Sequence, residues 1–301
     1  MRLVIAGGTG FIGSALCQRL RANNHSVTIL TRTQRPKADN PTEKWVRWDP
    51  STGEIPADTI DGADGIINLA GEPIAGKRWT ASQKEKIRSS RIMTTRALVN
   101  AAANAKVKPK FLLNGSAVGY YGPRGDETIT EEANPGNDFL SQVCAEWEQE
   151  AKKAESLGLR VALMRTGIVL GKGGALAKMV PPFKFFAGGP LGSGQQWMPW
   201  IHLEDEFGLI LFLIDRADAV GPFNATAPNP VTMKEFCSTL GRVLGRPSWA
   251  PVPGFALRIL LGEMAEMLLT GQRVLPARAQ KLGYKFRYAN LFEALQACMP
   301  L

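Results

Sequence analysis

The sequence of 301 residues has few of the side chains that build metal centres or disulfide frameworks. It contains 4 cysteines and 2 histidines, and none of them falls in the CxxC or HxxxH spacing of a zinc site. Widely spaced cysteines in a chain of this length exclude a small, disulfide-stabilised secreted fold. We therefore expect reduced thiols, no bound metal and a cytoplasmic location.

Long hydrophobic stretches are also missing. The longest apolar run, residues 207–214, ends at Asp215 and is far shorter than the roughly 18 residues of a membrane span. The amino terminus passes from Met1 to Gly7 and Gly8 without the apolar core and cleavage site of a signal peptide. These absences predict a cytoplasmic protein with no membrane partner.

Acidic residues are outnumbered in this chain. There are 36 Lys and Arg against 27 Asp and Glu, which gives a net charge of +9 and suits an anionic partner. The basic residues are scattered, and they form neither an aromatic-interleaved RNA-binding pattern nor a zinc finger, so we expect no nucleic-acid partner. An apolar content of 45% is ordinary for a folded globular protein.

The order of apolar runs and helical stretches indicates the fold class. Continuous apolar runs predict strands at 3–6, 27–30, 65–70, 111–114 and 161–164. Helical spacing predicts helices at 14–20, 83–103 and 141–157. Alternation of this kind favours an α/β protein with a Rossmann-type, doubly wound parallel sheet over residues 1–170.

The second part of the chain has a different texture. Residues 171–196 are rich in glycine and proline and predict long loops. A helix at 205–214, a late strand at 221–227 and a helix capped by Thr232 follow, and residues 251–301 are mostly helical in pattern. We expect a smaller C-terminal substrate lobe with a helical module over residues 171–301, the chain returning to the sheet around 200–227.

A glycine-rich turn follows the first expected strand. Gly8, Gly10 and Gly13 form a GxGxxG string, and Gly7, Gly10 and Gly13 form its wider-spaced variant. Between a strand and a helix, such glycines allow the backbone to approach a pyrophosphate at the helix N-terminus. The turn predicts a dinucleotide-binding site.

The end of the second strand indicates which dinucleotide binds. NAD sites usually place a carboxylate there for the ribose 2′-hydroxyl, but the first carboxylate of this chain is Asp39. Arg32, with Arg35 and Lys37 nearby, can instead pair with a 2′-phosphate. We therefore expect NADP(H) rather than NAD, the alternative being that Arg32 is an ordinary surface residue.

Several motifs resemble those of a known superfamily. With the glycine turn, the segments 68–71 and 114–122 resemble the extended short-chain dehydrogenase/reductases, the NAD(P)-dependent epimerase/dehydratases. Further segments are similar to its atypical "epimerase family" branch, namely 77–79, 90–91, 165–171, 188–194 and 199–202, and 271–276 resembles the C-terminal helical module of that branch. Some relatives carry a SulA-type cell-division label, which suggests a link to division.

The resemblance implies a set of cofactor-binding residues. They are Gly7, Thr9, Gly10, Phe11, Ile12 and Gly13 at the pyrophosphate, Thr31 and Arg32 at the adenosine phosphate, Leu69, Ala70, Gly71 and Arg91 along the cofactor, and Val169 at the nicotinamide end. Arg91 could equally be a surface residue of its helix.

The catalytic Tyr-x-x-x-Lys pair of the superfamily is absent. None of the 4 tyrosines has a lysine four positions later, and the corresponding helix carries Phe139 and Val143, neither of which can exchange a proton. Ser116 remains at the end of the fourth strand. If chemistry occurs, we expect Tyr120 or Tyr121 to supply the hydroxyl, the alternative being aromatic packing over the cofactor.

Glu72, Trp200 and His202 are expected to line a substrate pocket, although a lone histidine is often structural and tryptophans often pack in cores. Two functions stay open. The first is an NADP(H)-dependent oxidoreductase or epimerase acting on an unidentified small substrate. The second is an NADPH-binding regulatory or scaffold protein without turnover, with a protein partner and a role linked to cell division.

Overall fold

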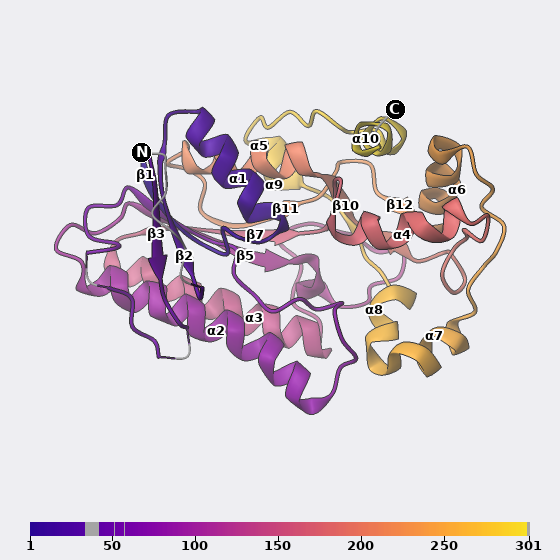
Figure 1. The fold of residues 1–301 in the computed structure, drawn as a ribbon, viewed down its shortest axis with the longest axis horizontal. Helices are drawn as coiled ribbons and strands as arrows, with labels where there is room; N and C mark the ends of the chain where they lie inside the picture. The colour runs from indigo at the N-terminus through magenta and orange to yellow at the C-terminus, as the bar shows by residue number, and fades with distance from the viewer. Residues whose placement is uncertain (34–41, 51, 57, 300–301) are drawn as a thin grey trace.

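The structure is a computed structural model that describes residues 1–33, 42–50, 52–56 and 58–299. Within these residues, seven parallel strands form one sheet in the order β11-β7-β5-β4-β1-β2-β3 (Figure 1). Their bounds are β1 Arg2–Ala6, β2 Ser26–Thr31, β3 Glu43–Arg47, β4 Gly65–Asn68, β5 Phe111–Ala117, β7 Arg160–Thr166 and β11 Gly221–Ala225. The order confirms the predicted doubly wound Rossmann-type fold.

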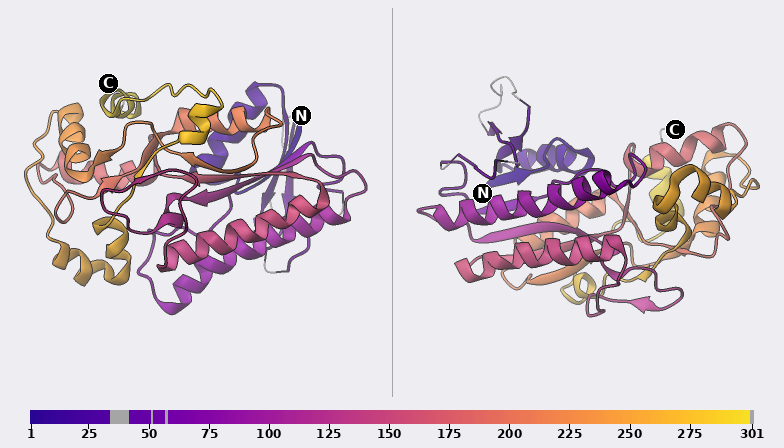
Figure 2. Two further views of the ribbon diagram at one scale, coloured as in Figure 1. Left: turned by 180° about the vertical axis from the view of Figure 1, so that it is seen from behind. Right: turned by 90° about the horizontal axis from the view of Figure 1, so that it is seen from below.

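Helices cover both faces of the sheet. Figures 1 and 2 show α2 (Ala81–Asn104) and α3 (Phe139–Lys152) side by side on one face, with α1 (Phe11–Ala22) and α5 (Leu203–Ile214) on the other. The two cores divide β1 between them, because Leu3 and Ile5 pack toward α1 while Val4 and Ala6 pack toward α2. Burial on both faces explains why the strands read as continuous apolar runs.

The order in which the chain adds strands to the sheet reverses at β1. From β1 it passes by way of α1 to β2 and β3 on one side, and later to β4, β5, β7 and β11 on the other. A crevice is expected where the order reverses, outside the carboxyl ends of β1 and β4, and ligands of doubly wound sheets bind in such crevices.

One strand of the sheet was not predicted. β3 carries Glu43, Lys44 and Arg47 around its two apolar residues, and all five of its residues are at least partly exposed. A half-exposed edge strand lacks the continuous apolar run that identifies its neighbours, so its sequence alone does not mark it.

Short elements build the lobe beside the sheet. Its strands pair as β8 (Ile168–Leu170) with β10 (Trp200–His202), β9 (Trp197–Met198) with β12 (Val231–Thr232), and β6 (Thr128–Ile129) with β13 (Arg273–Val274). Its helices are α4 Gly174–Lys184, α6 Met233–Leu244, α7 Gly254–Leu261, α8 Glu266–Leu269, α9 Ala277–Lys281 and α10 Leu291–Cys298, with 3-10 turns η1 Val118–Tyr121, η2 Lys153–Leu157 and η3 Gly262–Ala265. The predicted cap of α6 is confirmed, since Thr232 and Glu235 form a capping box.

The loop expected over 171–196 is wrong in its first half, which folds as α4. Pro181 and Pro182 lie in the last turn of this helix. A proline inside a helix costs about 3 kcal/mol, but burying an apolar side chain returns about 1.5–3 kcal/mol. Leu176 and Phe183 are both buried in the lobe core, and their burial offsets the cost.

Several side-chain features bear on the absences noted in the sequence. All four cysteines are buried free thiols. None of the helices in the described part of the chain is long and apolar enough to cross a bilayer. Over the same residues, no three His, Cys, Asp or Glu side chains gather as a metal site would require.

Candidate functional site

The glycine turn joins β1 to α1 with no room for side chains. Gly7 has a φ of +83°, and a Cβ on it would lie 2.6 Å from the carbonyl carbon of Leu69. A Cβ on Gly13 would lie 2.1 Å from the carbonyl oxygen of Gly7. Both positions therefore require glycine, because they bring β1, the first turn of α1 and the segment after β4 into backbone contact.

The N-terminus of α1 is open. Its N-cap, Gly10, offers no side chain to the first turn, and that turn contains no acidic residue. The first amide bonded within the helix is that of Ser14, which donates to Gly10 O at 2.9 Å. The amides of residues 11–13 are thus free to meet an anion, and the helix dipole favours negative charge there.

Arg32 lies just past the end of β2 and is exposed, whereas Thr31 is buried. The Oγ1 atoms of Thr31 and Thr33 lie 3.2 Å apart and shape the turn that presents Arg32. No carboxylate occurs at 31–33. The neighbouring cations Arg35 and Lys37, like Asp39, lie outside the described residues.

A buried polar network fixes the segment after β4. Asn68 Nδ2 donates to Asn114 Oδ1 at 2.7 Å and to Thr95 Oγ1 at 2.9 Å. Asn68 Oδ1 accepts from the amide of Ala70 at 3.2 Å. Leu69 and Ala70 are half-buried and Gly71 is exposed, so this strip forms a small-residue wall held firmly beside the glycine turn.

Arg91 is not a free surface residue. Its Nη1 donates to the carbonyls of Glu72, at 3.1 Å, and Ile87, at 2.8 Å. A Cβ on Gly71 would lie 2.9 Å from its guanidinium carbon, and burial lowers the pKa of Arg91. The guanidinium therefore supports the wall at 71–72 from behind and places positive charge next to it.

Glu72, Phe11 and Val169 are each held by their own neighbours. The half-buried Glu72 accepts a long hydrogen bond, 3.4 Å, from Gln83 Nε2. The ring of Phe11 packs under the backbone of Gly173, where a Cβ would come within 2.9 Å of it. Val169 is buried on β8, paired with Ile201 of β10. The start of the lobe thus packs against the Phe11 side chain, beside the N-terminus of α1.

The hydroxyl of Ser116 belongs to a buried ionic cluster. It donates to Glu148 Oε1 at 2.7 Å, and Arg165 forms a bidentate pair with the same carboxylate at 2.8 and 2.9 Å. Arg165 Nη1 also donates to Tyr121 Oη at 2.9 Å, and Tyr121 Oη donates to Asn224 Oδ1 at 2.6 Å. These five side chains, which we name the ionic cluster, link β5, α3, β7 and β11.

The two tyrosines expected to supply a hydroxyl are placed very differently. Tyr121 is fully buried, its hydroxyl both donates and accepts within the ionic cluster, and burial raises its pKa to about 12. The expectation that Tyr121 exchanges a proton with a substrate therefore does not hold in this structure. Tyr120 is half-buried, with its ring stacked 3.5 Å from the guanidinium carbon of Arg165.

The two positions that correspond to the missing Tyr-Lys pair carry apolar side chains that pack against their neighbours. Phe139, in the first turn of α3, packs edge-on against Trp79 with ring centroids 5.3 Å apart. Val143, one turn later, is buried. No proton-transfer group lies at either of these two positions.

Trp200 and His202 do not face a pocket. The indole of Trp200 lies wholly inside the lobe core. His202 caps α5, its Nδ1 accepting from the amide of Glu204 at 3.1 Å, and its ring lies 3.9 Å from that of Tyr288. Burial lowers its pKa to about 4. Both residues were expected to contact substrate. The cap of α5 accounts for His202, while the buried Nε1 of Trp200 has no hydrogen-bond partner within the described residues.

Two polar residues were not singled out in the sequence. Arg273 lies over the Trp197 ring, 4.8 Å from its centroid, with a buried Nε that has no hydrogen-bond partner in the described part of the chain. Glu206 is fully buried, Thr166 Oγ1 donates to it at 3.0 Å, and burial raises its pKa to about 8. No sequence signal marks Glu206, because it occupies an ordinary helix position; Arg273 stands in the 271–276 motif.

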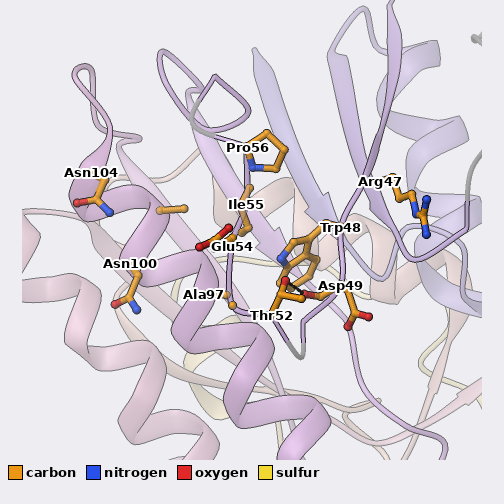
Figure 3. Close-up of a pocket in the computed structure, with 12 residues that line it drawn as sticks. Arg47, Trp48, Asp49, Thr52, Glu54, Ile55, Pro56, Ala97, Asn100 and Asn104 are labelled. Atoms are coloured by element: carbon orange, nitrogen blue, oxygen red, sulfur yellow. Dashed lines mark hydrogen bonds between the residues drawn. The ribbon is translucent and has the colours of Figure 1, made fainter.

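A separate cavity of about 760 Å³ lies between the segment after β3 and the second half of α2 (Figure 3). Trp48 forms its buried wall, and its Nε1 has no hydrogen-bond partner among the described residues. The other lining residues are Arg47, Asp49, Thr52, Gly53, Glu54, Ile55, Pro56, Ala97, Asn100, Ala101 and Asn104. None of them is a residue that the sequence predicted for the cofactor or substrate.

Residues 3–225 match the model of a protein family described as the NAD dependent epimerase/dehydratase family. The chain belongs to this family. Residues 252–298 also match a domain of unknown function, DUF1731. Membership agrees with the resemblance drawn from the motifs, and the family match covers the whole sheet together with the glycine turn.

Named members of this family cover almost the entire chain. The epimerase family protein SDR39U1 homolog of Arabidopsis thaliana, described as chloroplastic, is 46% identical over 304 residues, covering 99% of this chain and 87% of that protein. The epimerase family protein YfhF of Bacillus subtilis is 43% identical over 296 residues, covering 98% and 97%. Neither protein's name specifies a substrate.

A crystal structure of the human epimerase family protein SDR39U1 with NADPH is similar to this protein throughout. The TM-score is 0.89 with 34% sequence identity, and the alignment covers 99% of both chains. NADPH is bound to the human protein in that crystal structure. This shows that a close structural relative holds NADPH on this fold.

Proposed function

We propose that this protein binds NADPH in the crevice at the carboxyl ends of β1 and β4, and that it uses the nucleotide to reduce a small substrate. The observation that carries the proposal is the combination of an open helix N-terminus at Gly10 with an exposed guanidinium at Arg32. The NADPH in the human relative supports the same choice.

The residues present fit such a nucleotide. A Cβ at Gly7 or Gly13 would fill the cradle, which only glycine leaves open for a pyrophosphate. Arg32 can pair bidentately with a 2′-phosphate, and no carboxylate at 31–33 opposes it. When bound, a reduced nicotinamide supplies a hydride to an electron-poor carbon.

The polar groups for the substrate end differ from those of the superfamily. Tyr120 is the one hydroxyl among Ser116, Tyr120 and Tyr121 that makes no hydrogen bond within the described residues, so we assign it the contact to a substrate oxygen. The Arg165 guanidinium stacks on the Tyr120 ring and fixes its position. Arg273, whose buried Nε has no hydrogen-bond partner within the described residues, offers a cation to an acidic substrate group.

Nucleotide selectivity tests the proposal directly. Titration of the purified chain is expected to show tight binding of NADPH and much weaker binding of NADH. Arg32→Asp should weaken NADPH and improve NADH, because a carboxylate repels the 2′-phosphate and accepts from a 2′-hydroxyl. Arg47→Asp, which changes an exposed arginine at the end of the next strand, is the matched control. Equal affinity for the two nucleotides in the unaltered protein would contradict the role of Arg32.

A second function is favoured by the ionic cluster, namely an NADPH-binding regulatory protein without turnover. Ser116 and Tyr121 donate their hydroxyl protons to partners inside the protein, and Phe139 and Val143 replace the usual proton-transfer pair. NADPH consumption measured over a panel of carbonyl compounds and nucleotide sugars separates the two. Turnover that is lost in Tyr120→Phe supports the enzyme, whereas binding with no consumption of NADPH supports the regulator. None of the relatives' names given above concerns cell division.

A further inference from the structure

Large apolar side chains that face solvent gather in one part of the lobe. Among the described residues, Val107 is the only such side chain elsewhere that is more than half exposed. The others range from 54% exposure at Phe186 to 81% at Phe185. They are Phe185, Phe186, Trp249, Phe255, Ile259 and Leu260, which we name the apolar tip.

The apolar tip consists of two groups: Phe185, Phe186 and Trp249 lie after α4 and α6, and Phe255, Ile259 and Leu260 lie on α7. Trp249 Nε1 donates to Phe186 O at 2.9 Å, and the Arg246 guanidinium carbon lies 4.7 Å from the centroid of the Phe186 ring. Figure 1 shows the chain descending from α6 along the end of the molecule to α7, and the views in Figure 2 place α7 at the same end. The tip therefore occupies the end of the molecule away from β1 and β3.

The helix α7 carries apolar side chains on its solvent side as well as on its buried side. Leu257 is buried, while Phe255, Ile259 and Leu260 face solvent. Surface helices of soluble proteins normally present polar side chains outward, because exposed apolar area orders water at a free-energy cost. A gathered patch of large apolar side chains marks a surface that is covered by something else.

The chain around the tip is basic. Residues 171–203 and 236–262 contain no aspartate or glutamate. They contain the cations Lys172, Lys178, Lys184, Arg242, Arg246 and Arg258. Glu263 and Glu266, which follow, are ion-paired with Lys84 and Arg258. Lys184, Arg242 and Arg246 make no ion pair within the described residues, so positive charge remains beside Phe185, Phe186 and Trp249, and it is complementary to an anionic surface.

We propose that the apolar tip docks the protein on a bilayer surface that contains anionic phospholipid. Aromatic and aliphatic side chains enter the boundary between headgroups and acyl chains, and lysine and arginine attract the anionic headgroups. A bilayer accepts protruding side chains without the shape complementarity that a protein partner needs. The docking is peripheral, and it revises the expectation of no membrane partner, which rested on the missing span and not on the surface.

Co-sedimentation with vesicles tests this proposal. The full chain is expected to bind vesicles of equal parts phosphatidylcholine and phosphatidylglycerol, and to bind pure phosphatidylcholine weakly. Ile259→Asp with Leu260→Asp should lower the affinity at least about tenfold, because apolar area no longer enters the bilayer. Lys184→Glu with Arg246→Glu should lower it about fivefold or more for each charge reversed.

The matched control makes the same kinds of change outside the tip, just after the C-terminus of α2. Val107→Asp with Lys108→Glu alters one exposed apolar residue and one exposed cation outside the tip, and it should leave vesicle binding unchanged. NADPH affinity, which none of these variants touches, reports that each is folded. Failure of the unaltered chain to bind anionic vesicles would overturn the proposal. So would equal vesicle binding by the tip and control variants, or a dimer in solution that the tip variant alone abolishes, since the face would then belong to a second copy.

Discussion

The two halves of the crevice use their polar groups in opposite ways. In the nucleotide half, residues 7–13, 31–32 and 69–71, backbone amides and the Arg32 guanidinium are left open toward a ligand. In the other half, at the ionic cluster, Ser116 and Tyr121 are bonded to Glu148, Arg165 and Asn224 inside the protein. The glycine turn and the ionic cluster therefore use separate residues, and each half can be altered without the other.

The largest effect is expected in the half that holds the ionic cluster. Glu148→Ala leaves the Arg165 guanidinium buried without its carboxylate, which should lower the free energy of unfolding by about 3–5 kcal/mol. Denaturant unfolding followed by circular dichroism measures it. Glu146→Ala removes the partner of Arg88 at the surface of the same helix and should cost at most about 1 kcal/mol. Similar losses in the two variants would show that the ionic cluster is not a special feature of this half.

The second-largest effect is expected in the nucleotide half, on the affinity for NADPH. Gly13→Ala puts a Cβ 2.1 Å from Gly7 O, so the backbone of the turn must move. We expect NADPH affinity to fall by about 2–3 kcal/mol, or roughly 100-fold, measured by calorimetric titration. Gly76→Ala is the control, because a Cβ on Gly76 would lie 3.7 Å from the Cβ of Pro73, which is an ordinary van der Waals contact. Retained affinity in Gly13→Ala would mean that the turn does not hold the pyrophosphate.

The next effect is a pH dependence of stability caused by Glu206, which accepts a hydrogen bond from Thr166 at the end of β7. The pKa of the Glu206 carboxyl is about 8 in the folded protein against 4.5 ordinarily, because it is buried. Between these values the folded chain holds a proton that the unfolded chain has released, so stability falls as pH rises through this window, by at least about 2 kcal/mol. Thermal unfolding at pH 5 and pH 9 should show the fall, and Glu206→Gln should remove it. The same fall in Glu206→Gln would assign the pH dependence to another group.

The smallest effect concerns a residue that belongs to neither half. His202→Ala removes the cap of α5 and should lower the free energy of unfolding by about 1 kcal/mol. NADPH affinity should stay unchanged, and any pH profile of turnover should lack a histidine step between pH 5 and 8, since burial lowers the His202 pKa to about 4. A turnover defect in a stably folded His202→Ala would return this residue to the substrate site.

Local sequence patterns predicted most of the sheet domain. The runs at 3–6, 27–30, 111–114 and 161–164 lie within strands of the structure, because strands buried on both faces must be continuously apolar. The glycine turn was predictable for a similar reason, since its backbone conformation excludes side chains. The half-exposed strand β3 and the proline-containing helix α4 were missed, because their formation depends on neighbours distant in sequence.

The sequence by itself determined the class of the fold and the cradle for a dinucleotide, because glycine spacing and strand patterning act through the local backbone. Only the tertiary structure decided the fate of individual polar side chains. It drew Tyr121 into a buried network, made His202 a helix cap, enclosed Trp200 in the lobe core and left the face of α7 exposed. Burial and pairing arise from segments that meet only when the chain folds, and no spacing along the chain records them.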